Sequence, residues 1–233
     1  MSIPAAQVQT WVTVASVGLD PRAIATLQQI VGADRRLLAL RAYLRAGNSL
    51  SQRWSWSEQR LSGYASTAEG KAASADIDAV AIAFAASNAG YSLQVNRQPR
   101  SLELQLAHWN ENAAVVKVAA SLARSIQRQF GAGAKPPDAE TLRRALTAWV
   151  PTVAAPLAAP GLSAHGQGRA FDFQIMRDGE IVAGLDAASA PLQWDAAGWT
   201  ERLHAAVSAA GRPFTGPLRS PYEPWHYAYA PAL

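Results

Sequence analysis

The chain of 233 residues contains no cysteine, only four histidines, and only three lysines among its 21 basic residues. Without cysteine it can form no disulfide, no thiolate zinc site and no cysteine nucleophile. Any transition-metal site must therefore be built from histidine, aspartate or glutamate. The histidines stand at positions 108, 165, 204 and 226.

Long hydrophobic runs are also absent. No stretch approaches the roughly 20 apolar residues that a membrane-spanning helix needs, so we expect no membrane span. The first 18 residues lack a basic segment, and Gln7, Gln9 and Thr10 interrupt their apolar run. This pattern is not that of a secretory signal peptide, so we expect synthesis in the cytoplasm.

Charge is sparse: 16% of residues are charged and the formal net charge is +4, whereas 49% are hydrophobic. The apolar fraction predicts a sizeable core rather than disorder. A mildly basic protein can attract a polyanion such as nucleic acid, but the arginines are scattered rather than massed in one segment. We therefore expect no nucleic-acid partner.

The first 75 residues have the spacing of helices. Asp20 is a candidate N-cap for a helix over 20–32, with Pro21 at its first position and Gly32 at its end. Residues 33–47 place apolar side chains at helical spacing, and Ser55 and Glu58 have the spacing of a capping box. We predict a helical N-terminal region of unknown role over 1–75.

From residue 76 helical and strand patterns alternate. The segments typical of helices are 77–90, 113–131, 138–149 and 195–210. The segments typical of strands are 91–96, a hairpin over 168–184 that turns at Asp178–Gly179, and 223–229. The prediction is an α+β fold: a small antiparallel sheet with a zinc cleft, flanked by helices, in a domain over 76–233.

Asp172 stands between Phe171 and Phe173, although a buried carboxylate is costly unless a cation pairs with it. Side chains alternate between the two faces of a strand. The phenylalanines would then face the core and Asp172 the opposite side, where it could belong to a metal site.

Two short motifs hold most of the candidate chemistry. The first is Ser163-x-His165-x-x-Gly168-x-Ala170-x-Asp172, and the second is Glu223-Pro224-Trp225-His226. His165, Asp172 and His226 would provide two imidazoles and a carboxylate, and three protein ligands with an open fourth position are typical of catalytic zinc. Glu223 could act there as a general base. His108 and His204 are interpreted as helix-face residues without a metal role.

The pattern S-x-H-x-x-G-x-A-x-D, followed downstream by E-x-W-H, resembles the D-alanyl-D-alanine carboxypeptidase and dipeptidase branch of the LAS metallopeptidases. That group is named for lysostaphin, D-Ala-D-Ala peptidases and the sonic hedgehog domain, and the branch includes phage endolysins that cut peptidoglycan stem peptides. The tripeptide Ala-Pro-Gly at 159–161 and the order of the elements are also similar. The resemblance covers residues 76–230.

The resemblance implies a role for each residue of the metal motifs. His165, Asp172 and His226 would hold Zn²⁺. Glu223 would take a proton from the attacking water and pass it to the leaving amine.

It also implies residues that handle the substrate. Arg100 would stabilise the oxyanion or grip a substrate carboxylate, because it resembles the arginine of the family's Y-R-S-x-x-x-Q element. Ser163 would contact substrate, and Gln105 would position Arg100 or the ligand. The segment "NRQPRS" departs from the family's usual S-G-Y-R-S turn, so Arg97 competes with Arg100 for this role.

The function implied is zinc-dependent hydrolysis of peptidoglycan stem peptides, as a D,D-carboxypeptidase or endopeptidase or as an L-Ala-D-Glu endopeptidase. The chain would act in the periplasm or cell wall as an endolysin or a delivered effector, with any immunity or delivery partner unknown. The alternatives are a cytoplasmic D-Ala-D-Ala dipeptidase and a non-catalytic metal-binding module of the same fold.

Overall fold

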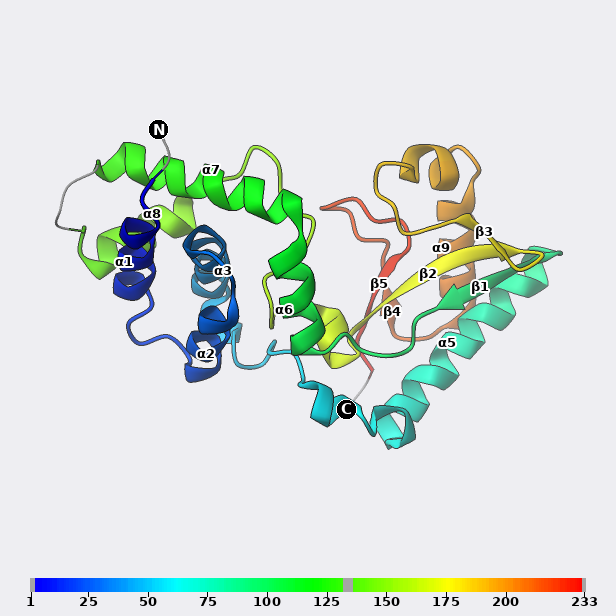
Figure 1. The fold of residues 1–233 in the computed structure, drawn as a ribbon. Helices are drawn as coiled ribbons and strands as arrows, with labels where there is room; N and C mark the ends of the chain where they lie inside the picture. The colour runs from blue at the N-terminus through cyan, green and yellow to red at the C-terminus, as the bar shows by residue number, and fades with distance from the viewer. Residues whose placement is uncertain (1–2, 132–135, 232–233) are drawn as a thin grey trace. The chain divides into compact units, whose positions relative to one another are not determined.

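The computed structural model describes residues 3–131 and 136–231 and confirms the α+β class, with helices and a small antiparallel sheet (Figure 1). The chain forms two compact units. Unit 1 comprises Met1–Ser57 and Arg100–Ser163, and unit 2 comprises Glu58–Pro99 and Ala164–Leu233. The boundary expected at residue 75 falls inside a helix of unit 2, and each unit combines two separate segments.

Unit 1 is helical. Its α-helices are α1 (Ala5–Ala15), α2 (Pro21–Gln29), α3 (Ala33–Ala46), α6 (Leu102–Glu111), α7 (Ala113–Phe130) and α8 (Ala139–Ala148), with a short 3₁₀ turn η1 (Gly47–Ser49). Residues 132–135, between α7 and α8 in the sequence, lie outside the described residues. No helix of the described chain combines the length and the hydropathy that crossing a bilayer requires.

Short polar side chains start four of these helices, because they accept hydrogen bonds from the first free backbone N–H groups. Asp20 accepts from the backbone of Arg22, as the sequence predicts. Ser101, Asn112 and Asp138 cap α6, α7 and α8 in the same way. Gly32 has a different role from the predicted one: α2 ends at Gln29, and Gly32, with φ of 87°, precedes the first residue of α3.

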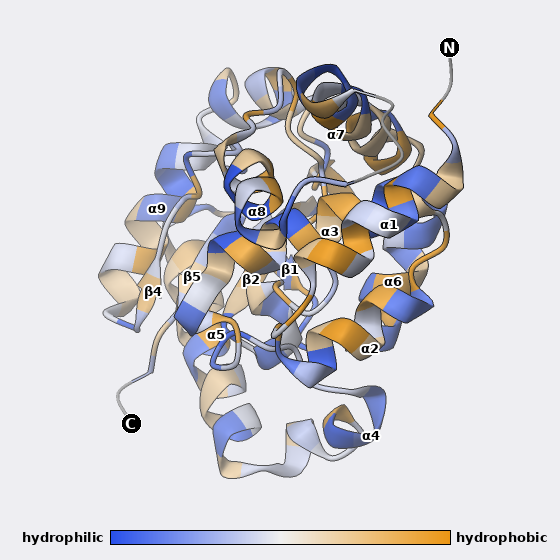
Figure 2. Cartoon of the chain, turned by 90° about the vertical axis from the view of Figure 1, so that its left-hand side faces the viewer, coloured by the Kyte–Doolittle hydropathy of each residue, from blue (hydrophilic) through white to orange (hydrophobic). Residues whose placement is uncertain are grey.

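The core of unit 1 gathers around α3, which packs against α1, α7 and α8. Figure 2 shows hydrophobic residues in orange along α2 and α3. Leu37, Leu40 and Tyr43 of α3 are almost fully buried, together with Leu122 of α7. Amphipathic helices thus bury their apolar stripes against one another, which is the main source of their stability.

The two chain segments of unit 1 meet at Ser55. The Ser55 hydroxyl lies 3.4 Å from the carboxamide oxygen of Gln105 and 3.2 Å from the carbonyl oxygen of Ser163, both of which can accept its hydrogen bond. Within the second segment, the same Gln105 oxygen accepts from the backbone N–H of Gly161. Ser55 therefore ties segments of unit 1 together. The Ser55–Glu58 spacing is typical of a helix start, and the helix that follows it, α4, begins at Glu58 and comprises only Glu58–Leu61, in unit 2.

Unit 2 contains the sheet. Besides α4, its helical elements are η2 (Tyr64–Ser66), α5 (Ala68–Ser87), η3 (Ala164–Gln167), η4 (Pro191–Asp195) and α9 (Trp199–Ala210). Its strands are β1 (Tyr91–Val95), β2 (Ala170–Arg177), β3 (Glu180–Ala183), β4 (Phe214–Thr215) and β5 (His226–Tyr229). They pair antiparallel in the order β1-β2-β5-β4, and β3 also pairs with β2.

The two faces of β2 separate as the alternation predicts. Phe171, Phe173 and Ile175 lie in the core of unit 2. Helices α5 and α9 pack against each other and contribute Phe84 and Leu203 to the same core; Figure 1 shows both helices beside the sheet. Because side chains alternate along a strand, Asp172 is directed away from this apolar face.

The hairpin between β2 and β3 turns at Asp178–Gly179, as predicted. Both residues have positive φ, 51° and 85°. That conformation suits two-residue turns, whose twist matches the flanking strands. Strand β5 is shorter than predicted, because it starts at His226 and leaves Glu223 in the preceding loop.

We predict that Asp20→Ala lowers the free energy of unfolding by about 1 kcal/mol, because the cap of α2 is lost. Hydrogen bonds from the side chains of Arg22 and Ser51 hold the pKa of Asp20 well below its usual value. Its contribution is therefore present above about pH 4 and is lost as the pH falls. Urea unfolding at pH 7 and at pH 3 measures both effects.

The matched control is Asp20→Asn, which keeps a capping oxygen but no charge. It should retain most of the stability at pH 7 and lose the pH-dependent part. Equal pH dependence in the wild type and the Asn variant would contradict this assignment.

Candidate metal centre

The pairing of β2 with β5 places Asp172 directly opposite His226. Directly opposed side chains on one face of an antiparallel pair have Cβ atoms about 4.5–5.5 Å apart. The backbone N–H of Phe173 donates to the carbonyl of Trp225 at 3.0 Å, next to this pair. The strand register alone therefore brings together two residues that lie 54 positions apart.

His165 reaches the same point from η3, which directly precedes β2. The loop turns back on itself, because the backbone N–H of Arg169 donates to the carbonyl of Ala164 at 3.0 Å. Gly168 lies in the turn with φ of 62°, a left-handed conformation that glycine adopts without steric cost. The turn brings the imidazole of His165 beside the carboxylate of Asp172.

The donor atoms converge closely. Nε2 of His165 lies 3.2 Å from Nδ1 of His226 and 3.4 Å from Oδ1 of Asp172. Nδ1 of His226 lies 3.0 Å from the same carboxylate oxygen. A tetrahedral ion with bonds of about 2.0–2.1 Å holds its donor atoms about 3.3 Å apart. The observed spacing matches that of three ligands around one ion.

Hydrogen bonding alone accounts poorly for this arrangement. Nδ1 of His226 has Asp172, His165 and Glu223 within 3.0–3.6 Å, but a ring nitrogen carries at most one proton. A cation bound between these donor atoms would satisfy them together. His165, Asp172 and His226 could hold a metal ion, and no second group of this kind occurs among residues 3–131 and 136–231.

Glu223 lies at the edge of the cluster, with Oε2 3.6 Å from Nδ1 of His226. The loop that carries it is fixed by backbone hydrogen bonds: Glu223 donates to the carbonyl of Leu218, and His226 donates to the carbonyl of Glu223. The side chain of Asp172 is 9% exposed, whereas that of Glu223 is 25% exposed. Water can therefore reach the cluster beside Glu223.

Buried aromatic rings support the strand that carries His226. Trp225 is buried and its ring centroid lies 6.0 Å from that of Trp194. Tyr227 packs against Phe173 with ring centroids 5.7 Å apart. Trp225 is therefore a packing residue.

The substrate residues suggested by the resemblance belong to unit 1. Gln105 is buried, and its side-chain NH₂ donates to the carbonyl of Arg100 at 2.7 Å. The carbonyl of Ser163 accepts from the hydroxyl of Ser55. Gln105 thus holds the backbone of Arg100 within unit 1.

Arg97, the competitor of Arg100, belongs to unit 2. Its guanidinium forms an exposed ion pair with Asp78 of α5 and also donates to the Ser74 hydroxyl.

His108 on α6 and His204 on α9 are exposed and lie outside the metal group. This agrees with their interpretation as helix-face residues.

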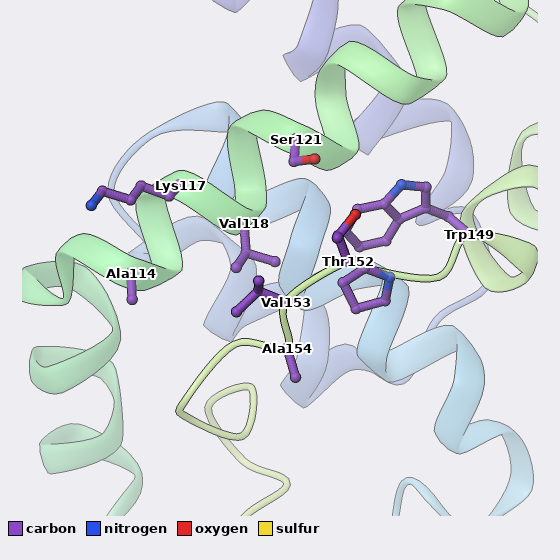
Figure 3. A pocket seen from close by; sticks show the side chains of 9 residues that line it. Ala114, Lys117, Val118, Ser121, Trp149, Thr152, Val153 and Ala154 are labelled. Carbon is purple, nitrogen blue, oxygen red and sulfur yellow. The ribbon is translucent and has the colours of Figure 1, made fainter. Parts of the chain in front are cut away.

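A hollow in unit 1 has a volume of about 290 Å³, but its chemistry is limited. Its described lining consists mainly of small apolar residues and Trp149, and Lys117 is the charged residue among them. In Figure 3 the side chain of Lys117 runs away from Trp149. Because its described lining includes no histidine, aspartate or glutamate, the hollow is a weaker candidate than the cluster in unit 2.

Comparison with known proteins adds no relative: no family model, no curated protein and no solved structure matches the chain. The chemistry of the site therefore rests on the residues themselves.

No motif predicts the contact of Tyr64 with the loop that carries His165. The phenol end of Tyr64 lies against Gly168, although Tyr64 precedes His165 by about 100 positions. Residue spacing contains no signal for a packing contact across such a distance. The contact becomes apparent only in the folded unit.

We predict that His226→Ala abolishes tight binding of one divalent ion, because it removes one of the three candidate ligands. Elemental analysis after dialysis against a zinc buffer measures the bound metal. His204→Ala, an exposed histidine of the same unit, is the control and should bind one ion. Equal metal content in the two variants would refute the site.

Proposed function

We propose that the chain is a zinc-dependent peptidase that hydrolyses the stem peptides of peptidoglycan. The observation that carries the proposal is the convergence of His165, Asp172 and His226 on one point, with the Glu223 carboxylate at its edge. The motif resemblance adds the substrate class. The proposed place of action is the periplasm or cell wall.

Zinc fits the donor set. Two imidazoles and one carboxylate, without cysteine, form a ligand set known from catalytic zinc sites. Three ligands leave a fourth position open, and the exposure of Glu223 indicates where solvent enters. When bound, a zinc ion would polarise the scissile carbonyl and make water a stronger acid. The cleft expected around the ion belongs to this proposal.

Glu223 is the proposed general base. Its carboxylate is near enough to the ligand cluster to accept a proton from a water molecule that attacks the peptide carbonyl. The same carboxyl group would then donate that proton to the leaving amine nitrogen. The backbone hydrogen bonds that link Glu223 to Leu218 and His226 support this role, because they hold the base in a defined position.

Arg100 is the proposed oxyanion or carboxylate partner of the substrate. A guanidinium is permanently charged and presents several donors in one plane, which suits either task. The bond from Gln105 to the Arg100 carbonyl supports a positioning role for Gln105. The proposed substrate contact of Ser163 rests on the motif resemblance alone.

We predict that Glu223→Gln retains bound zinc and lowers the hydrolysis rate by about 10²–10⁴-fold, because the amide cannot accept the proton. His165→Ala should lose both metal and hydrolysis. Mass spectrometry of muropeptides released from purified sacculi measures the rate. Undiminished hydrolysis by the Gln variant would overturn the assigned base.

A substrate panel separates the proposal from its alternatives. A peptidoglycan hydrolase should release fragments from whole sacculi, whereas a dipeptidase should act only on free D-Ala-D-Ala. A non-catalytic module should bind metal and cleave neither substrate. The presence of Glu223 beside the ligands argues against this last alternative.

A further inference from the structure

Tyr64 contacts the metal-binding loop from a segment outside the region of motif resemblance. It begins η2, and its side chain is buried, with 6% of the residue exposed. A Cβ atom added to Gly168 would lie 2.5 Å from the Tyr64 phenol oxygen and 3.0 Å from the adjacent ring carbon. The end of the ring thus lies directly on the Gly168 backbone, where only glycine fits.

Tyr64 is itself held firmly by the start of α5. Its carbonyl accepts hydrogen bonds from the backbone N–H of Thr67 at 3.0 Å and from the Thr67 hydroxyl at 2.7 Å. The Thr67 hydroxyl in turn caps α5 by accepting from Gly70. A Cβ at Gly70 would lie 2.0 Å from the Tyr64 carbonyl oxygen, so η2 packs tightly on the first turn of α5.

Gly168 links the packing of Tyr64 to the metal ligands, because it lies between two of them in the sequence. It stands three positions after His165 and four before Asp172, in the turn that joins η3 to β2. Asp172 is already fixed by the sheet, whereas His165 is carried by a four-residue 3₁₀ turn. Short 3₁₀ segments have poorer hydrogen-bond geometry than α-helices, so a packing contact from outside the loop can add to its stability.

We propose that Tyr64 is a positioning residue for the metal site: its ring braces the Gly168 turn and thereby aims His165 at the ion. The proposal rests on the metal-binding part of the proposed function and is independent of peptide hydrolysis. Groups that orient metal ligands commonly change metal affinity by 10–100-fold when they are removed. Segment 58–67 is then part of the metal-binding unit in function as well as in packing.

A double-mutant cycle tests the contact. Tyr64→Ala should weaken Zn²⁺ binding by about tenfold or more, as measured by competition with a chromophoric chelator. Gly168→Ala should weaken it too, because the new methyl group meets the phenol. In the double variant the methyl group has room, so the combined loss should be smaller than the product of the single losses. The strain of alanine at positive φ is present in both backgrounds and cancels.

Two further variants keep the test decisive. Tyr64→Phe keeps the ring and removes only the oxygen nearest to the Gly168 position, so it should bind Zn²⁺ better than Tyr64→Ala and partly relieve Gly168→Ala. If Tyr64→Ala does not fold, as judged by circular dichroism, this second cycle decides. Tyr229→Phe is the matched control, because Tyr229 is a buried tyrosine of unit 2 whose hydroxyl donates to Asp76 of α5. It should bind Zn²⁺ as the wild type does.

Additive losses in the cycles, or wild-type Zn²⁺ affinity in a folded Tyr64→Ala protein, would overturn the proposal. A loss of affinity in Tyr229→Phe equal to that in Tyr64→Ala would also overturn it, because any buried tyrosine would then have the same effect. If the wild type binds Zn²⁺ but cleaves no stem peptide, the peptidase function fails and the role of Tyr64 stands.

Discussion

The register between β2 and β5 is the constraint on which the rest of unit 2 depends. It sets Asp172 opposite His226 and Phe171 opposite Tyr227. Because the side-chain period of a strand is two, a slip of one residue would turn the carboxylate into the apolar core and a phenylalanine toward the ligands. One pattern of backbone hydrogen bonds therefore determines both the packing of the core and the position of the metal ligands.

The apolar face of strands β2 and β5 stabilises the opposite face, which carries Asp172 and His226. Phe171, Phe173 and Phe214 pack edge to face with neighbouring aromatic rings in the core of unit 2. Bringing a carboxylate and two imidazoles close together is unfavourable without a cation, since each group loses hydration. A rigid aromatic layer behind the strands can hold such a cluster ready for an ion, because closely packed interiors resist deformation.

The sequence predicts the local features of this fold well and its long-range features only in part. The cap at Asp20, the hairpin at Asp178–Gly179 and the alternation around Asp172 each depend on neighbouring residues, and all three appear in the structure. The convergence of His165 with His226 is an expectation that the motif resemblance supplies, because residue spacing alone does not bring two histidines 61 positions apart together. The two-segment composition of each unit and the contact of Tyr64 with Gly168 depend on packing between distant segments, which periodicity does not encode.

The interleaving of the two units has a consequence for biosynthesis. A ribosome has synthesised both segments of unit 1 once it reaches residue 163. The first segment of unit 2, Glu58–Pro99, is made before that point, and the second is made from residue 164 onward. Helix α5 and strand β1 therefore emerge long before β2, the strand that pairs with β1. Domains of a nascent chain generally fold as they emerge. Unit 1 can therefore fold while the apolar residues of α5 still lack the contacts with α9, which is synthesised later. During that interval the apolar residues of α5 are exposed, which favours aggregation of the incomplete chain.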